Sequence, residues 1–341
     1  MNLRFPALCA CAVIAAAFLA SCATSSHIAS TPAAPVVWPA PPDEARIAYV
    51  RTLHVPRDIG QSPSVFTRIG HWITGEGSQT LALQKPFGLA LDESGNLCVT
   101  DTGANLVCYL DFSHKKWRRY PAAGKTAFVS PVAIARHAGI FYVADSGLGK
   151  VLAFGDDGKS VFEISQPLVR PVGLALAGDS LAVVDSQSHA VFVFDLTGKL
   201  RFKFGQRGIG PGEFNFPTHI ANDGAGHWLV TDSLNCRIQT FSASGDFISQ
   251  FGSSGDTSGH FGRPKGVAAD SFGHIYVADA LYDNVQIFDP AGRLLLNFGQ
   301  SGDGPDSFSL PNGIAISPDN SIYIADGYNH RVEQFKYMGG Q

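Results

Sequence analysis

The segment Pro264–Phe288, PKGVAADSFGHIYVADALYDNVQIF, carries a pattern that occurs six times in this chain. Each copy has a Pro, usually a small residue two positions later, an apolar strand, a second strand that ends in Asp, and a third strand. The copies begin at Pro86, Pro131, Pro171, Pro217, Pro264 and Pro311. Their starts are 45, 40, 46, 47 and 47 residues apart, and regular spacing of this length is typical of propeller blades or other stacked repeats.

Within this unit, residues 266–269, 275–278 and 285–288 are predicted strands separated by turn-forming residues, and a fourth strand is predicted at 293–298. A sheet of four short antiparallel strands cannot bury both faces alone, so each sheet must stack on its neighbours. Six such sheets close a ring and leave few exposed edges. The sequence therefore predicts an all-β fold, a six-bladed β-propeller with four-stranded antiparallel blades.

The last copy lacks a fourth strand, because only residues 336–341 follow its third strand at 331–335. Residues 46–53, RIAYVRTL, are a strand candidate that belongs to no copy. We expect this N-terminal strand to become the outer strand of the last blade and to close the ring. Between it and the first copy, residues at about 62–74 start with Ser and Pro and have a one-sided apolar pattern, which predicts a short amphipathic helix that covers apolar surface on one face.

The N-terminus has the features of a targeting segment. Residues 7–19 are an apolar run that is too short for a good membrane span and fits a secretory signal. The run ends in Leu19-Ala20-Ser21-Cys22, which resembles the bacterial lipobox. The resemblance implies cleavage before Cys22, a lipid on its thiol and, with Ala23 next, sorting to the outer membrane. Ordinary signal cleavage beside an incidental Cys is the alternative.

We therefore divide the chain into a lipoprotein signal peptide (1–21), a tether rich in Pro, Ala and Ser (22–42) and a propeller domain (43–341). The tether shows no periodicity that would support a packed element. The predicted location is the cell envelope, on the periplasmic side of the outer membrane, with the lipid anchor as the membrane contact.

Composition limits the possible partners. The chain has 341 residues, of which 45% are hydrophobic, a net charge of −4 and a pI near 6.2. This length and composition suffice for a large core in one domain. Because the charge provides no basic field, nucleic acid is excluded as a predicted partner.

The repeated segments P-x-G-[ILV]-A, [IY]-Y-V-A-D and N-x-[RV]-V-Q-x-F resemble NHL repeats, best in residues 264–288 and 311–335. The Gly-rich segments at 204–217, 251–264 and 298–311 resemble the blade connections of this family. The tether, closing strand and helix resemble bacterial lipoproteins that carry such propellers. The resemblance implies a binding platform, but propellers of similar architecture include an amidating lyase and metal-dependent lactonases, and fold alone does not choose between these functions.

An Asp ends the second strand in every copy: Asp101, Asp145, Asp185, Asp232, Asp279 and Asp326. Any one of these carboxylates taken alone has the chemistry of a catalytic acid or a metal ligand. A residue that is required six times at the same place is better explained as a turn former, whose carboxylate accepts hydrogen bonds from backbone N–H groups of the following loop.

His219 occupies the position that Gly or Ala holds in the five other copies. The innermost strand of a blade lies beside the central channel, so this imidazole is expected near the channel mouth. Neighbouring positions of other copies contribute Arg170, Arg263, Lys265 and Asn312. The set predicts a site for a small anion or a carboxylate. The alternative is that His219 fills a gap and bonds to the backbone.

Loops expected on the same rim differ between copies and carry His189, Tyr282, Tyr328 and His330. Variable loops on a rigid ring predict a recognition surface, and solvated loops without a ligand are the alternative. No histidine cluster with zinc spacing and no Gly-x-Ser-x-Gly motif occurs in the sequence. Metal ligands that come singly from different blades would leave no such spacing.

Three cysteines lie in the predicted propeller: Cys98, Cys108 and Cys236. An oxidising compartment permits a disulfide between Cys98 and Cys108, which are predicted on adjacent strands, but does not require one. Buried free thiols are the expected state.

These observations predict an envelope protein that binds a partner protein or a small ligand at one face of the ring, without catalysis and without a cofactor. The alternative function is a metal-dependent lyase or hydrolase of the amidating-lyase or lactonase type. Its calcium or zinc ion would lie at the channel mouth near His219.

Overall fold

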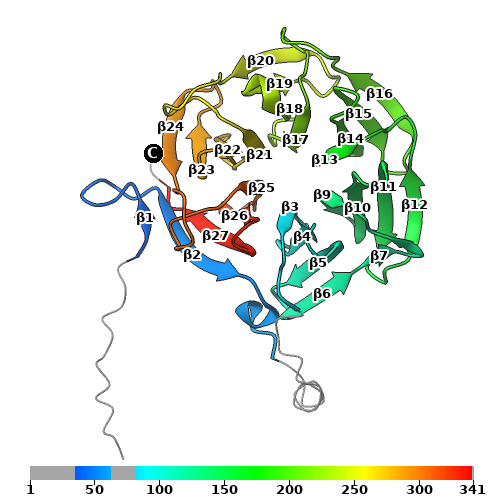
Figure 1. Cartoon of the computed structure of the whole chain (residues 1–341), viewed down its shortest axis with the longest axis horizontal. Helices are drawn as coiled ribbons and strands as arrows, with labels where there is room; N and C mark the ends of the chain where they lie inside the picture. The colour runs from blue at the N-terminus through cyan, green and yellow to red at the C-terminus, as the bar shows by residue number, and fades with distance from the viewer. Residues whose placement is uncertain (1–34, 63–80, 340–341) are drawn as a thin grey trace, which may run out of the picture. The chain divides into compact units, whose positions relative to one another are not determined.

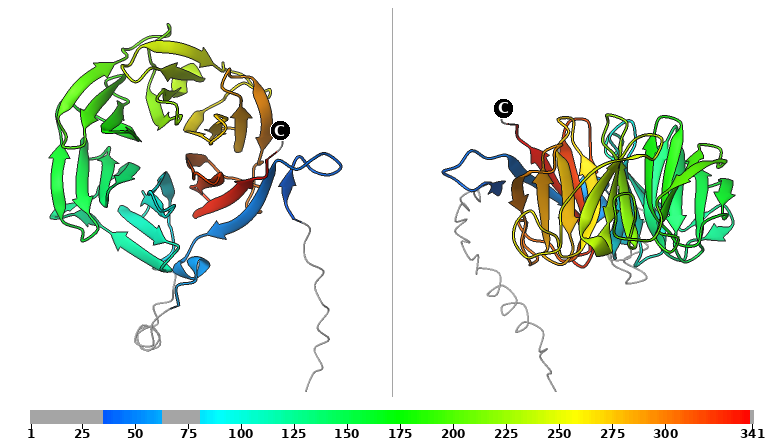
Figure 2. Two further views of the ribbon diagram at one scale, coloured as in Figure 1. Left: turned by 180° about the vertical axis from the view of Figure 1, so that it is seen from behind. Right: turned by 90° about the horizontal axis from the view of Figure 1, so that it is seen from above.

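The computed structural model describes residues 35–62 and 81–339. The described residues from Val36 onward form one compact unit, in which the strands build six blades around a central axis (Figure 1). Figure 2 shows the same ring from behind and from the side. The signal peptide, Cys22, the first part of the tether and, apart from Ser62, the predicted helix at about 62–74 lie outside the described residues. No described helix is long and apolar enough to span a membrane.

In the first three blades, sequence order runs from the channel outward. Blade 1 consists of β3 (Pro86–Leu91), β4 (Leu97–Asp101), β5 (Leu106–Asp111) and β6 (Lys116–Tyr120). Blade 2 consists of β9 (Pro131–His137), β10 (Ile140–Asp145), β11 (Lys150–Gly155) and β12 (Ser160–Ile164). Blade 3 consists of β13 (Pro171–Ala177), β14 (Ser180–Asp185), β15 (Ala190–Asp195) and β16 (Leu200–Phe204).

The remaining blades repeat this order. Blade 4 consists of β17 (Pro217–Asn222), β18 (Trp228–Asp232), β19 (Arg237–Phe241) and β20 (Phe247–Phe251). Blade 5 consists of β21 (Pro264–Ala269), β22 (Ile275–Asp279), β23 (Asn284–Phe288) and β24 (Leu294–Phe298). Blade 6 contains β25 (Pro311–Ile316), β26 (Ser321–Asp326) and β27 (Arg331–Tyr337). Short elements lie in the connections: η1 (Pro56–Ile59), β7 (Ala122–Ala123), β8 (Thr126–Ala127) and η3 (Ser233–Asn235).

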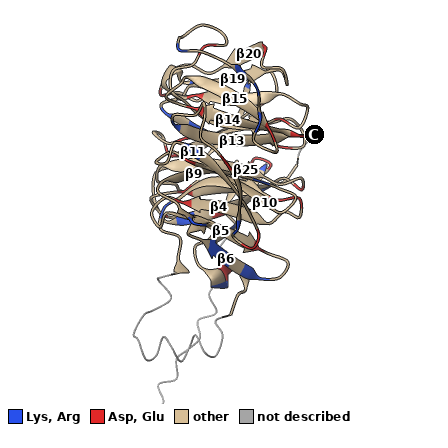
Figure 3. Cartoon of the chain, turned by 90° about the vertical axis from the view of Figure 1, so that its right-hand side faces the viewer, with Lys and Arg blue, Asp and Glu red and all other residues tan. Residues whose placement is uncertain are grey.

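The hydrophobic core lies between blades. One cluster joins Tyr142 of blade 2 to Leu181 and Phe192 of blade 3, and another joins Tyr276 of blade 5 to Ile324 of blade 6. Charged residues occur mainly in loops and on outer strands, while most of the strand ribbon is uncharged (Figure 3). Each blade therefore depends on its neighbours to bury its faces, as the repeat pattern predicts.

The small residue two positions after the proline lets neighbouring inner strands approach closely. A Cβ atom on Gly266 would lie 2.2 Å from the carbonyl oxygen of Asn312, and one on Gly313 would lie 2.4 Å from that of Phe87. Both distances are far shorter than van der Waals contact, so a side chain in this direction would push the blades apart. The inner strands pack in sequence order around the channel, and β25 returns to β3.

The structural role predicted for the repeated Asp is confirmed for Asp101, Asp145, Asp185 and Asp279, which accept backbone N–H bonds from the following loop. Asp232 and Asp326 accept side-chain bonds from that loop instead, from Asn235 and Asn329. Asp101 accepts hydrogen bonds from the backbone N–H groups of Gln84 and Lys85, at 2.7 and 2.8 Å, and from those of Gly103 and Ala104, both at 3.1 Å. All six Asp residues are buried, and each accepts at least one such bond from the segment that enters its own inner strand. The carboxylate thus joins the start of the first strand to the end of the second.

The predicted closure of the ring is also confirmed. Strand β2 (Ile47–Leu53) pairs with β27 of blade 6 in antiparallel register, from Ile47 opposite Tyr337 to Leu53 opposite Val332. The side chains of Ile47 and Leu53 are completely buried. The first and last long strands of the described chain therefore share one sheet.

The predicted tether is wrong over its last residues. Val37 and Trp38 form β1, which pairs with β2, and the Trp38 ring lies 5.5 Å from the ring of Phe298 and 5.7 Å from that of Phe335. A two-residue strand among prolines has no hydrophobic period, so sequence patterning does not reveal it. The propeller domain thus begins near residue 36 and not at residue 43.

Glu333 on β27 is a buried carboxyl group at the closure of the ring. The Nε atom of Arg331 lies 2.8 Å from its Oε1 atom, and the Thr52 hydroxyl of β2 donates to its Oε2 atom at 3.1 Å. Burial raises the pKa of Glu333 to about 7, although Arg331 opposes this shift. Glutamine occupies the matching positions of blades 4 and 5, as Gln239 and Gln286.

We expect Glu333→Gln to stabilise the protein at pH 8 and to have little effect at pH 5. A carboxyl group whose pKa is raised in the folded state favours folding while it is protonated, and this contribution is lost between about pH 4.5 and pH 7. At pH 8 the amide avoids the buried charge, which is worth about 1 to 3 kcal/mol. Chemical denaturation at both pH values measures the difference, and an equal effect at both would contradict it.

Cys98, Cys108 and Cys236 are buried free thiols, as expected. Cys98 lies opposite Tyr109, and Cys108 lies opposite Val99. The two cysteines are thus one register step apart and point to opposite faces of the sheet. Burial raises the pKa of the Cys108 thiol to about 12, so this group stays protonated.

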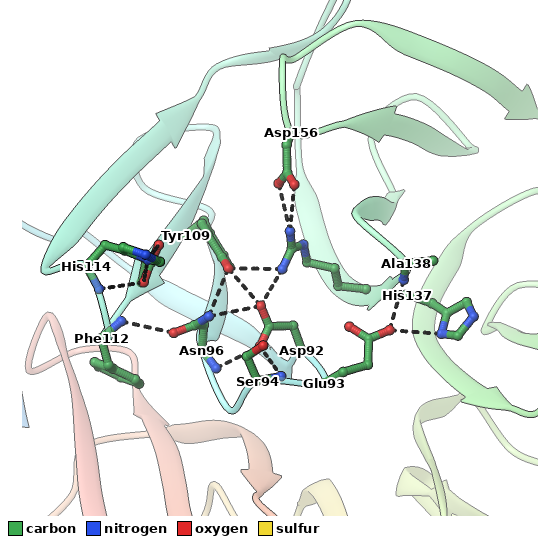
Figure 4. A network of polar contacts seen from close by, with 12 residues as sticks. Asp92, Glu93, Ser94, Asn96, Tyr109, Phe112, His114, His137, Ala138 and Asp156 are labelled. Carbon is green, nitrogen blue, oxygen red and sulfur yellow. Dashed lines mark hydrogen bonds and ion pairs between the residues drawn. The ribbon is translucent and has the colours of Figure 1, made fainter.

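A polar network joins blades 1 and 2 on the face that carries the turns between first and second strands (Figure 4). Arg136 pairs with Asp92 and Asp156, donates to the Tyr109 hydroxyl at 3.0 Å, and places its guanidinium 4.7 Å from the centroid of the Phe141 ring. Its side chain is 7% exposed. Arg136 is therefore a structural cation with its charge already paired.

Candidate functional site

The candidate site lies at one mouth of the central channel. We call this side the Asp face, because there the inner strands begin and the second strands end in Asp. A cavity of about 200 Å³ opens there between blades 1 to 5. Its lining consists of Phe87, Val132, Ser146, Arg170, Val172, Ser186, Phe216, Thr218, His219 and Lys265. The structure therefore brings together three of the five predicted channel-mouth residues in one cavity.

Two cations line this cavity, and a third lies close to it. Burial, and after it the positive charges of Arg263 and Arg170, lowers the pKa of Lys265. No Asp or Glu side chain belongs to the lining. Within residues 35–62 and 81–339, the side chains of Arg170, Arg263 and Lys265 form no ion pair. Two cations thus line a space whose lining has no acidic side chain, and the charge of Arg263 acts on one of them, Lys265.

Asp185 and Asp279 do not fill this role, although the repeat places them beside Arg170 and Arg263. The Asp185 carboxylate accepts the backbone N–H of Arg170 at 2.7 Å, and that of Asp279 accepts the backbone N–H of Arg263 at 2.9 Å. Both carboxylates are fully buried. Because both carboxylates are buried and hydrogen-bonded to backbone N–H groups, they do not pair with the guanidinium groups of Arg170 and Arg263.

His219 is a neutral ring at the base of the cavity. Burial, and then the charge of Lys265, lowers the pKa of His219 to about 3, so the imidazole carries no charge at physiological pH. Both ring nitrogens and the neighbouring Thr218 hydroxyl are buried without a hydrogen-bond partner in the described protein. The backbone bond considered for His219 in the gap-filling interpretation is therefore absent from the described residues, and three buried polar atoms have no partner there.

Phe87 and His219 together form the floor of the cavity. They come from blades 1 and 4, which lie across the channel from each other, and their rings stack with centroids 6.2 Å apart and planes inclined by 20°. Below them is a further space of only about 40 Å³, also lined by His219. The pair thus divides the channel and limits how deep a ligand can enter from the Asp face.

Asn312 and His189 do not belong to the site as predicted. The Asn312 side chain is buried and donates to the carbonyl oxygen of Leu310 at 2.8 Å. His189 is buried as well: its ring lies edge-on to Phe216, with centroids 4.6 Å apart, and its Nδ1 atom accepts the backbone N–H of Phe216 at 3.2 Å. Its φ angle of 51° places it in the left-handed region, and its ring packs against Phe216 at the start of blade 4 instead of lying free at the rim.

The other predicted rim residues lie in loops of the Asp face and differ in exposure and in contacts. Tyr328 is 55% exposed, and the Nζ atom of Lys85 lies 4.8 Å from the centroid of its ring. Tyr282 is half-buried. His330 is exposed, but its Nδ1 atom contacts the carbonyl oxygen of Gln84. Of these three, Tyr328 is therefore the most available to a partner.

Sequence reasoning missed seven of the ten lining residues: Phe87, Val132, Ser146, Val172, Ser186, Phe216 and Thr218. It also gave no role to the exposed apolar residues of the same face, which are Val129, Val169, Ile209, Leu234 and Leu281, each more than half exposed. Aligning all six copies at the residue after Pro, and at the residue after the second-strand Asp, would have identified every missed lining residue except Phe216. Both positions face the channel mouth in several blades.

A calcium or zinc ion does not fit the channel mouth. Zinc requires about three or four His, Cys or carboxylate ligands, and calcium about six to eight oxygen ligands. The lining holds one His and no Cys or carboxylate, and its side-chain oxygens are those of Ser146, Ser186 and Thr218, which are too few for calcium. Lys265 and Arg170 would also repel a divalent cation. No group of three or more His, Cys, Asp and Glu side chains within the described ranges is arranged to hold a metal ion.

Comparisons of sequence identify the repeat. A family model described as NHL repeat matches residues 308–335, and one described as 6-bladed beta-propeller matches residues 165–227. No curated protein matches the chain.

Comparisons of structure identify the same fold. An auxiliary nutrient binding protein from Bacteroides thetaiotaomicron is 13% identical over 76% of this chain and 71% of that chain, with a TM-score of 0.60. Virginiamycin B lyase from Staphylococcus aureus is 14% identical over 74% of this chain and 95% of that chain, with a TM-score of 0.55. At such identities the likeness shows the fold alone. The chain is thus a six-bladed β-propeller that contains NHL-type repeats.

Proposed function

We propose that this protein is a non-catalytic, lipid-anchored propeller of the cell envelope that binds an anionic group of a partner protein or small ligand at the mouth of its channel. The observation that carries the proposal is a cavity lined by Arg170 and Lys265, with Arg263 close to Lys265 and no acidic side chain in the lining. Arg170 and Arg263 are exposed, whereas Lys265 is partly buried. A partly buried cation without a partner costs free energy, and an anion bound beside Lys265 offsets that cost.

The cavity also supplies neutral groups that suit an anion. Ser146, Ser186 and Thr218 line it. The hydroxyls of Ser146 and Ser186 donate to Ser130 and to the carbonyl oxygen of Arg170, whereas the Thr218 hydroxyl has no partner in the described protein. The neutral imidazole of His219 carries one N–H donor. Charge-assisted hydrogen bonds from Arg or Lys to a carboxylate are the strong ones. The lining therefore combines cations for attraction with unpartnered neutral groups for orientation.

Binding is favoured over catalysis because the lining holds no acid–base pair. It has no carboxylate, and the pKa of His219, at about 3, is too low for efficient general-base catalysis near neutral pH. The fold itself is shared with proteins named as a nutrient binding protein and as a lyase, so it supports neither function over the other.

The anchor and the location rest on the sequence. The lipobox-like Leu19–Cys22 and the Pro-rich segment after it support a lipid on Cys22 and a place at the periplasmic side of the outer membrane.

We expect Lys265→Met to weaken anion binding by about 10-fold or more, because a hydrogen bond to a charged group contributes about 1.5 to 3 kcal/mol. Calorimetric titration of the full chain in detergent with sulfate and with citrate, at constant ionic strength set with chloride, measures the affinity. Lys203→Met is the matched control, because Lys203 is exposed on the outer strand β16.

Without added anion, Lys265→Met is expected to unfold at a higher temperature than the wild type, because it removes a half-buried charge that Arg170 and Arg263 repel. Equal anion affinities of Lys265→Met, Lys203→Met and the wild type would refute the site.

A further inference from the structure

We infer that the group bound at the channel mouth is the C-terminal carboxylate of a polypeptide that ends in an aliphatic residue. The inference rests on the proposed anion site and specifies what carries the anion.

The first argument is the mixed chemistry of the lining. Arg170 and Lys265 provide positive charge, whereas Val132, Val172 and Phe216 provide apolar surface in the same cavity. An inorganic anion such as sulfate would leave the apolar part in contact with water. A carboxylate joined directly to an aliphatic side chain, as at the end of a polypeptide, matches both parts.

The second argument is size. The cavity has a volume of about 200 Å³, below the usual range of roughly 300 to 1,000 Å³ for small-molecule sites. The stacked rings of Phe87 and His219 close its base. There is thus room for about one terminal residue, and the rest of a larger ligand must lie outside.

The third argument is the surface just outside the mouth. Val169 is adjacent to Arg170 and is 58% exposed, and Val129 occupies the matching position of the preceding blade and is 52% exposed. Leu281 and Tyr328 are exposed on loops of the same face. Apolar side chains beside a cationic pocket would contact the residues that precede the C-terminus, and capture of a terminal carboxylate is a known way to recognise peptides.

A long acyl chain fits these features less well. Its carboxylate would match the cations, but the floor of Phe87 and His219 leaves no apolar tunnel for a chain of many methylene groups. The chain would then remain on the surface. A peptide, in contrast, has backbone N–H and C=O groups that can bond to polar loop residues such as the exposed Gln187.

The test uses the full chain in detergent and fluorescein-labelled hexapeptides Gly-Ser-Gly-Ser-Gly-Val, one with a free C-terminal carboxylate and one with a C-terminal amide. Fluorescence anisotropy measures both affinities, with unlabelled sulfate and octanoate as competitors. We expect the free acid to bind about 10-fold or more tightly than the amide, since the amide loses a charge-assisted hydrogen bond. We also expect Lys265→Met to remove this preference and Lys203→Met to keep it.

The outcomes separate the inference from the proposed function. Equal binding of acid and amide, or binding of sulfate without binding of either peptide, would overturn the peptide inference and leave the anion site standing. Octanoate competing more strongly than the free-acid peptide would overturn it in favour of an acyl chain. Binding of neither sulfate nor any peptide would refute the proposed function as well.

A second variant, Phe87→Ala, tests whether the floor of the cavity limits the size of the terminal side chain. Phe87→Ala is expected to join the mouth cavity to the space of about 40 Å³ below it and to improve binding of a Phe-terminated peptide relative to the Val-terminated one by about 5-fold. Preference for the free acid should persist, because the cations are unchanged. An unchanged ratio between the two peptides in a folded Phe87→Ala protein would show that the terminal side chain does not enter the cavity, and this would overturn the inference.

Discussion

Removal of residues 1–53 is expected to lower the free energy of unfolding by about 5 kcal/mol or more, whereas removal of residues 1–34 is expected to leave it unchanged. The longer deletion removes the completely buried Ile47 and Leu53. It also exposes the edge of β27, which otherwise pairs with β2. A strand edge without a hydrogen-bonded neighbour can pair with strands of other chains, so aggregation should accompany the loss of stability.

A deletion to residue 42 provides the intermediate case. It spares β2 but removes Trp38, whose ring packs on Phe298 and Phe335, and loss of this half-buried ring should cost about 2 kcal/mol. Chemical denaturation of the three truncated proteins gives the order of stability. Equal stability of the proteins that start at residues 35 and 43 would show that β1 contributes nothing, and equal stability of all three would refute closure by β2.

Arg237→Leu is expected to cost about 3 to 5 kcal/mol, because it leaves a buried carboxylate without its partner. The Nε atom of Arg237 donates to Asp232 at 2.8 Å, and its Nη2 atom donates to the carbonyl oxygens of Gly210 and Glu213 at 2.8 and 2.9 Å. The Arg237 side chain is 7% exposed and that of Asp232 is completely buried. One guanidinium thus holds the turn of blade 4 to the connection before it.

Arg293→Leu is the matched control. Arg293 makes a similar contact with Asp289, at 2.6 Å, but its side chain is 82% exposed, so its loss should cost less than about 1 kcal/mol. Urea denaturation of both variants measures the contrast. Adding Asp232→Asn to Arg237→Leu should recover part of the loss, and a double variant less stable than Arg237→Leu would contradict the explanation by an unpaired charge.

The fold was predictable because one sequence pattern occurs six times in the chain. Six copies of one pattern determine blade number and strand order, and the missing fourth strand of the last copy points to residues 46–53. The two-residue strand at Val37 and Trp38 was not predictable, because its stability comes from ring contacts with Phe298 and Phe335, which are far away in sequence.

The candidate site was predictable in part, for the same reason. Arg170 and Lys265 come from different blades, but equivalent repeat positions lie at equivalent heights in the ring, so comparison of the copies placed both at the mouth. His189 was misplaced because a loop position gives no information on the contact with Phe216 of the following repeat, which covers its ring. The neutral state of His219 depends on burial opposite Phe87, which only the closed ring creates.

The sheet of blade 6 also has a kinetic consequence. Ile47 pairs with Tyr337, so the contact that closes the ring joins segments from nearly opposite ends of the chain. During synthesis β2 is made first and stays unpaired until β27 has emerged from the ribosome. Blades in the middle of the chain can form hairpins early from local contacts, but contacts of such long sequence separation are slow to form. Completion of the ring is therefore expected to be the last and slowest step of folding, and a nascent chain that stops before β27 would hold an exposed, apolar β2.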